Sequence, residues 1–301
     1  MREMFLAKKG IALLITLFFI MAITVAIGIG LKQVNEASAN VQKEKTLLQT
    51  SMILDDILNF FNTSKLLGGI KDQTSLYIFL SQASFIPFES SGIKAMIELS
   101  SARSKFPVNK IRNNNASKEA LIYYLNQYMV NPPYVDMLLD ATGGISASDT
   151  YLSGIFYDNP YLYRQNITSL EHLSVVNDFY MKTYRDNKLD KIELDNLFSF
   201  SNKANYRIDL NYATPQVWEL LLGCDNPRAI ELSENAGAYT GKMEYIQEDE
   251  KEVLAQFSNI VSYFEPYINV NIEIIQDKQS AKISFEYDMK LKKGYNFVYE
   301  I

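Results

Sequence analysis

An uncharged apolar run near the start of the chain constrains its fold more than any other feature. The run Ile11–Leu31 is 21 residues long and contains no charged residue. As an α-helix rising about 1.5 Å per residue it would be roughly 32 Å long, close to the hydrocarbon thickness of a bilayer. The ten residues before it hold three basic residues and one acidic residue, and basic residues favour the cytoplasmic side. The run therefore predicts a single-pass helix in the cytoplasmic (inner) membrane, with the rest of the chain in the periplasm.

Two simpler explanations of this run are a plain signal anchor and a cleaved secretory signal. The tripeptide Ala-Ser-Ala at 37–39 has the small-x-small form of a secretory cleavage site. However, the apolar run exceeds the roughly 7–15 residues of such signals, and Lys32 and Glu36 lie close to the cut. A helix that stays on the protein is favoured over a discarded signal.

Composition excludes several classes of chemistry. The 301 residues carry 29 basic and 35 acidic side chains, a net charge of −6, which argues against a nucleic-acid partner because phosphates require clustered Lys and Arg. A single cysteine, Cys224, excludes an internal disulfide, and a single histidine, His172, excludes a zinc site built from several histidines. The sequence also lacks a Gly-x-Ser-x-Gly nucleophile and P-loop spacing. We therefore expect no enzymatic activity.

Helical spacing continues beyond the apolar run. Apolar residues recur at steps of three, four or seven as far as Phe61, which predicts one long helix over residues 11–62, with 11–31 in the membrane. The composition of the following segment, 63–100, predicts short strands at Ser75–Leu80 and Ala95–Leu99. It is predicted to be the first part of a small antiparallel sheet.

The middle and the end of the chain have different patterns. Residues 101–262 are predicted to be mostly helical, with Ser117 and Ser169 as N-caps of two of the helices. Residues 263–301 alternate apolar and polar side chains, first over 268–274 and then over 283–289, and a last strand is predicted at Tyr295–Tyr299. The predicted fold class is α+β, with a long N-terminal helix, a small sheet and a large helical domain.

The residues around the start of the apolar run resemble a type IV prepilin leader. Lys8-Lys9-Gly10 is followed directly by the run that begins with Ile11. In that family a membrane peptidase cuts after the glycine and methylates the new N-terminus, and the apolar helix stays on the protein. The resemblance implies a leader over residues 1–10, cleavage after Gly10 and a mature chain that starts at Ile11.

The fifth mature position departs from most members of that family, because it is Ile15 instead of glutamate. A carboxylate inside a membrane or a helical bundle is costly unless it meets a positive partner. In pilins that partner is understood to be the N-terminal amine of a neighbouring subunit. A subunit at the tip has no neighbour above it, and the K subunit of type II secretion pseudopilins has this pattern of large size and no glutamate.

A second resemblance to the same K family lies in the segment 206–230. An apolar strand runs into Asn211-Tyr212-Ala213-Thr214-Pro215, a helix follows as far as Gly223, and a second helix carries Ala229 and Ile230. Thr214 can cap the first helix, Pro215 suits its first position, and Gly223 suits the turn that ends it. The resemblance implies a pilin-type sheet closed by strands from both ends of the soluble region, with 101–262 inserted between them.

The function implied by this resemblance is assembly. A minor pseudopilin of this kind caps and nucleates a short periplasmic filament for protein export, and the helix docks on neighbours through Ile11, Ile15 and Leu31. Its expected partners are other minor pseudopilins, the major pseudopilin, the prepilin peptidase and the cytoplasmic membrane.

Cofactors and alternatives complete the predictions. The K family is understood to bind calcium through Asp-rich loops, but only Asp140, Asp149 and Asp158 remain near the corresponding loop, so calcium stays open and no ligand or other cofactor is assigned. A minor subunit of a competence or type IV pilus system would use the same parts. A membrane-anchored periplasmic enzyme or binding protein is the alternative from another class, and it requires a pocket within 101–262.

Overall fold

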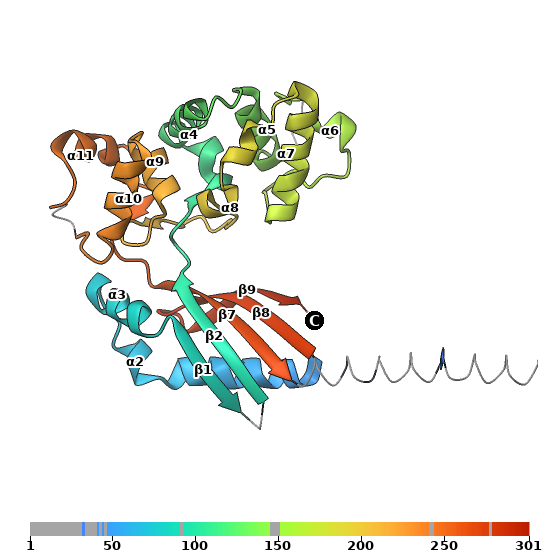
Figure 1. The fold of residues 1–301 in the computed structure, drawn as a ribbon, viewed down its shortest axis with the longest axis vertical. Coiled ribbons are helices and arrows are strands. Elements are labelled where there is room, and N and C mark those ends of the chain that lie inside the picture. Colours follow the sequence, from blue (N-terminus) through green and yellow to red (C-terminus); the bar gives the residue numbers. More distant parts are fainter. Residues whose placement is uncertain are drawn as a thin grey trace, which may run out of the picture.

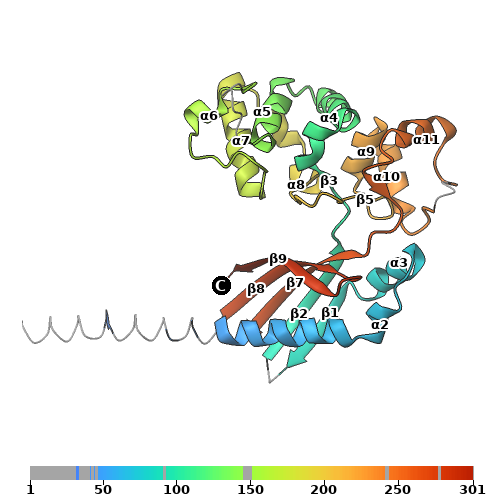
Figure 2. The ribbon, with the colours of Figure 1, turned by 180° about the vertical axis from the view of Figure 1, so that it is seen from behind.

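A computed structural model describes residues 32, 33, 41, 44, 47–90, 93–144, 151–240, 244–276 and 279–300. Two units are seen in Figures 1 and 2: a sheet unit, made of the described residues of 47–101 and 263–300, and a helical insert, made of those of 102–262. The predicted leader 1–10 and membrane run 11–31 lie outside the described residues. Among the residues that are described, no helix has the length and apolar composition needed to cross a bilayer.

The first helix of the sheet unit, residues 47–63, lies along one face of the sheet. Its buried residues Ile53, Leu54, Ile57 and Phe61 recur at helical spacing and pack in the core of that unit. The Phe61 ring meets the edge of the Tyr287 ring at 5.3 Å. These contacts confirm the predicted helix over the part of 11–62 that is continuously described.

The prediction of a strand at Ser75–Leu80 is wrong. That segment lies in α3 (Gln73–Gln82), which follows the short helix α2 (Lys65–Gly68). Asp72 starts α3 with a reciprocal capping box, in which its carboxylate accepts from the Ser75 amide at 2.8 Å. Leu76 and Leu80, four residues apart, are buried, whereas Ile78 between them is exposed. A strand would place all three on one face, so the pattern is that of a helix.

The sheet has five antiparallel strands in the order β1-β2-β7-β8-β9. Their bounds are β1 (Phe85–Ser90), β2 (Ile93–Ser101), β7 (Tyr267–Gln276), β8 (Gln279–Asp288) and β9 (Lys293–Glu300). The chain leaves the sheet after β2 and returns as β7, the direct neighbour of β2, with Leu99 opposite Val270. Strands from before and after the insert thus form one sheet, as predicted, and the chain of the insert runs between two adjacent strands.

The alternation of apolar and polar side chains along the strands determines which face of the sheet is buried. On β7 the even-numbered residues from Ile268 to Ile274 are buried, and the register places them opposite the buried residues of β8 from Ala281 to Tyr287. This face packs on the helix 47–63. Four predicted strands are confirmed: Ala95–Leu99 by β2, 268–274 by β7, 283–289 by β8 and Tyr295–Tyr299 by β9. Strand β1 was not predicted, because Pro87 interrupts it.

The insert consists of short elements. In chain order they are β3 (Phe106–Pro107), η1 (Val108–Asn113), α4 (Asn115–Gln127), α5 (Pro133–Thr142), α6 (Ile155–Asp158), α7 (Leu170–Tyr184), η2 (Lys188–Lys191), α8 (Leu194–Leu197), β4 (Phe198–Ser199), β5 (Ile208–Asp209), α9 (Pro215–Leu222), α10 (Asn226–Glu234), α11 (Glu248–Ala255) and β6 (Val261–Ser262).

The insert has its own hydrophobic core. Its buried apolar residues run from Phe106 to Val261 and form one cluster around Trp218. The sheet unit has a separate cluster, drawn from 53–99 and 268–287. The two units are therefore two packed bodies joined by two crossings of the chain, at 101–106 and 261–267.

Most of the predicted capping residues of the insert do cap the ends of their helices. Thr214 accepts from the Val217 amide at 3.3 Å, and Gly223 ends α9 with a positive φ of 66°. A Cβ at Gly223 would lie 2.8 Å from the Tyr123 ring, so no other residue fits this turn without movement. Ser169 caps α7 as predicted. Ser117 does not cap α4, because Asn114 accepts from its amide and starts the helix earlier.

Candidate functional site at the helix face and the insert junction

The helix 47–63 presents a second, outward face that the sheet does not cover. Leu48 and Met52 lie four residues apart on this face and are 69% and 62% exposed. Phe60 is also exposed, but it lies toward the sheet side of the helix, with its ring centroid 6.4 Å from that of Phe88 in β1. The acidic Asp55 borders the outward face formed by Leu48 and Met52. Neighbouring apolar side chains on an exposed helix face are characteristic of a surface that another helix covers. The helix thus has one face for its own sheet and one face available for a partner.

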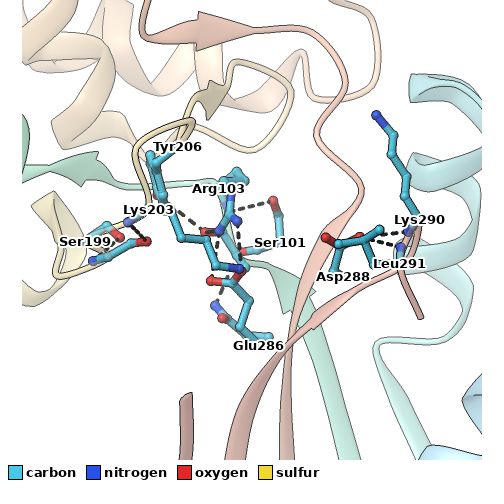
Figure 3. A network of polar contacts seen from close by, with 12 residues as sticks. Ser101, Arg103, Ser199, Lys203, Tyr206, Glu286, Asp288, Lys290 and Leu291 are labelled. Atoms are coloured by element: carbon cyan, nitrogen blue, oxygen red, sulfur yellow. Dashed lines mark hydrogen bonds and ion pairs between the residues drawn. The ribbon is translucent and has the colours of Figure 1, made fainter. Parts of the chain in front are cut away.

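The junction between the two units is built around a buried ion-pair cluster (Figure 3). Arg103, on the crossing that leaves β2, donates two hydrogen bonds to Glu286 of β8, at 3.0 and 2.8 Å. Lys203, from the loop after β4, pairs with the same carboxylate. Arg103 is only 1% exposed. Because one carboxylate meets two cations from the insert side, the cluster fixes how the insert stands on the sheet.

Aromatic rings complete this cluster. The Arg103 guanidinium lies between the Tyr267 and Tyr206 rings, 3.9 and 4.6 Å from their centroids. Burial alone would raise the pKa of the Glu286 carboxyl, but hydrogen bonds and charge from Arg103 and Lys203 outweigh it and lower that pKa. Glu286 is therefore held as a carboxylate.

Asp209 forms a second buried link across the junction. One carboxylate oxygen accepts from the Glu265 amide at 2.9 Å, and the other accepts from the Asn211 amide at 3.1 Å. The amide of Asp209 itself donates to the Arg103 carbonyl, so this residue ties the outgoing crossing to the returning one. Burial raises the pKa of Asp209 to about 6, which the amide donors only partly offset.

The insert also rests on the sheet unit through aromatic contacts. Tyr212 packs against the core of the sheet unit. Gly237 has a positive φ of 82°, and a Cβ there would lie 2.5 Å from the Tyr77 ring of α3. Together with the ion-pair cluster, this contact supports the insert at a second place.

A cleft of about 570 Å³ lies between the insert and the β7–β9 end of the sheet. Its walls include Asn269 and Asn271 of β7, Ser284 of β8, and Asn166 and Asn202 of the insert. The lining is thus rich in neutral amide and hydroxyl groups. Such groups hydrogen-bond polar ligands, but they are not a nucleophile and base pair.

The lone histidine and cysteine have local surroundings that disfavour their charged forms. Burial lowers the pKa of His172, and its Nδ1 lies 3.4 Å from the Thr168 amide and hydroxyl at the start of α7. Burial raises the pKa of the Cys224 thiol to about 11, which opposes the thiolate form. In the described part of the chain, both residues serve local packing and hydrogen bonding.

The acidic residues weighed as calcium ligands have other local contacts. Asp140 accepts from the amides of Leu152 and Ser153, and so closes a loop within the insert. Asp158 lies in α6 and is exposed, and Asp149 lies outside the described residues. Among the residues described, no group of three or more potential metal ligands gathers. A calcium site remains unassigned.

The processing and assembly residues predicted from sequence, Gly10, Ile11, Ile15 and Leu31, lie outside the described residues. Sequence reasoning missed the junction cluster of Arg103, Lys203 and Glu286. The only available signal was Glu286, a charged residue between the alternating apolar positions of a predicted strand. Such a residue normally faces solvent, so its partners could not be found from the sequence.

Comparison with solved structures finds a similar fold in a secretion-system complex. The structure matches one chain in the crystal structure of the GspK-GspI-GspJ complex from the type 2 secretion system of enterotoxigenic Escherichia coli, with a TM-score of 0.55. The match covers 86% of this chain and 99% of that chain, at 11% sequence identity. No family model and no curated protein matches the chain. The shared fold confirms the predicted α+β class with an antiparallel sheet, which has five strands here.

Proposed function

We propose that this chain is a K-type minor pseudopilin of a type II secretion system. In this role its N-terminal helix is retained after cleavage following Gly10, anchors the protein in the cytoplasmic membrane and docks on other pseudopilins in the periplasm. The observation that carries the proposal is the double use of the helix 47–63. It buries Ile57 and Phe61 on its own sheet and exposes Leu48 and Met52 on the other side, within a fold similar to a chain of a GspK-GspI-GspJ complex.

The insert supports the further proposal that this subunit caps the filament. It forms a separate body on the sheet unit (Figures 1 and 2) and is held there by the buried Arg103–Glu286 pair. A rigidly held body of this size would obstruct the addition of another subunit above it. Ile15 fits this position, since a capping subunit has no neighbour whose amine needs a carboxylate.

The test is co-expression of the full chain with candidate small pseudopilins, followed by isolation of the complex from detergent-solubilised membranes. The double variant Leu48→Glu/Met52→Glu places charges on the outward helix face and should abolish co-purification. Tyr161→Glu, at a site 99% exposed on the insert, is the matched control and should leave it intact. Complex formation that survives the helix variant, or that depends on the insert alone, would contradict the proposal.

A further inference from the structure

The edge strand β9 is the feature that the proposed assembly role does not use. It ends the order β1-β2-β7-β8-β9, and in the described part of the chain no segment pairs with its other side. Its main-chain groups along that side can therefore accept a further strand. Figures 1 and 2 show β9 on the side of the sheet that lies toward α8 of the insert, and residues 296–298 line the cleft there.

Part of β9 is protected against pairing and part is not. Lys293 lies at its start, and a bulge interrupts the register with β8, where Asn296 has a φ of 56°. Lysines and bulges commonly block edge pairing. Beyond the bulge, however, Phe297, Val298 and Tyr299 are consecutive, uncharged and exposed. The stretch open to pairing is therefore 297–300.

The two faces of this stretch differ. Phe297 stacks on Phe285 of β8, with ring centroids 4.9 Å apart. Phe285 belongs to the core that packs on the helix, and at this edge of the sheet both rings also border the cleft. Val298 lies opposite Ser284, which lines the cleft. A strand added here would direct alternate side chains over the cleft and over the Phe297 ring.

The charges around the cleft favour an acidic occupant. Two cations, Arg103 and Lys203, share the single carboxylate of Glu286, which leaves one excess positive charge. Lys105 also lines the cleft, and its amine makes no hydrogen bond to any residue that the structure describes. Burial lowers the pKa of Lys105, and the charge of Asp195 partly opposes this. Asp195 lines the same cleft but forms no close ion pair with Lys105 among the residues that the structure describes, so a carboxylate entering the cleft would be the first to bond the Lys105 amine directly.

We propose that the cleft beside β9 binds an extended, acidic segment of another polypeptide, which adds as a sixth strand along 297–300. The neutral amide and hydroxyl side chains of the lining, such as Asn271 and Asn202, would hydrogen-bond the segment's main chain. An acidic side chain of the segment pairs with Lys105. Only a polypeptide satisfies both the strand edge and the cleft.

The experiment pans a library of short random peptides on the full chain in detergent micelles and measures binding of synthetic copies of the enriched peptides. We expect enriched peptides that contain an acidic residue. Methylating alternate backbone nitrogens of such a peptide should abolish binding, because it removes the strand hydrogen bonds. Replacing its acidic residue by the amide should weaken binding by about tenfold, the loss of roughly one charge-assisted hydrogen bond.

A matched pair of variants locates the carboxylate. Lys105→Gln should weaken binding of the acidic peptide by about tenfold and leave the amide peptide unchanged, whereas Lys191→Gln, an exposed lysine of η2, should change neither. Circular dichroism confirms that both variants are folded. No enrichment over background, or binding that is insensitive to backbone methylation, would overturn the proposal. A dimer of the full chain that Val298→Asp dissociates would assign the edge to a second copy instead and would also overturn it.

Discussion

The sheet unit and the insert reach their stability by different routes. In the sheet unit, strands of up to ten residues alternate apolar and polar side chains over most of their length, and their buried apolar face lies on one helix. In the insert, the longest helix has 15 residues and most have ten or fewer, lengths at which an isolated helix is marginal in water. The insert therefore depends on packing around large buried side chains and on capped helix ends. The fold of the sheet unit is specified by the repeating alternation of apolar and polar residues, and that of the insert by individual packing contacts and helix caps.

The largest expected effect tests whether the two cores are energetically separate. Trp218→Ala removes the fully buried indole at the centre of the insert and should lower the free energy of unfolding of the insert by about 3–5 kcal/mol. Hydrogen exchange should accelerate in α9 and α10, while β7 and β8 remain protected. Tyr161→Ala, an exposed site, is the control. Equal loss of protection in both units would show that they share one folding unit.

The next effect concerns the junction between the units. Glu286→Gln removes the carboxylate that pairs with Arg103 and Lys203, and leaves a nearly fully buried guanidinium without a counter-charge. We expect a loss of about 3 kcal/mol in the free energy of unfolding. Lys203→Ala should cost less, since Lys203 is partly exposed and Arg103 keeps its pair.

Distances between spin labels on α4 and β1 measure the orientation of the insert in these variants. Glu286→Gln should broaden the distance distribution, and Lys203→Ala should leave it narrow. An unchanged distribution in Glu286→Gln would mean that the other contacts, those of Asp209, Tyr212 and Tyr77, orient the insert without the ion-pair cluster.

A smaller, pH-dependent effect comes from Asp209. Its pKa is raised to about 6 in the folded chain from the ordinary aspartate value of 3.8, so the folded state binds a proton more tightly than the unfolded state. The stability that this provides is present below about pH 4 and is lost as the pH rises through 6. Subtracting the profile of Asp209→Asn from that of the unaltered chain should reveal this decline. A flat difference between pH 4 and 6 would refute the assigned shift.

The smallest effect is that of a single helix cap. Thr214→Ala removes the acceptor of the Val217 amide and the hydroxyl that donates to the Asn196 carbonyl, and should cost about 1 kcal/mol in thermal or denaturant unfolding. Thr214→Ser keeps the hydroxyl and should recover most of that loss. If serine is no better than alanine, the threonine methyl and not the cap stabilises α9.

The same difference between the units explains what could be predicted from the sequence. Strands β7 and β8 were predicted because their alternation repeats over many residues. The sequence predicts a strand at Ser75–Leu80 because its β-prone residues outweigh the cap at Asp72, which only the folded geometry makes visible. Thr214 and Gly223 were predicted because local chemistry alone determines a cap or a left-handed turn.

The junction could not be predicted because its members are far apart in the chain. Arg103 and Glu286 are separated by 183 residues, and nothing local to either residue indicates the other. The cleft beside β9 has the same origin, since its walls come from the sheet and from loops of the insert. Such sites depend on the relative placement of two units, which residue patterns within each unit do not specify.

The measurement that tests the central claim most directly is the intact mass and N-terminal sequence of the full-length protein isolated from membranes. A retained assembly helix predicts a chain that begins at Ile11 with a methylated amine and still contains the run Ile11–Leu31. A chain that begins at Met1, or one cut beyond residue 31, would contradict the account.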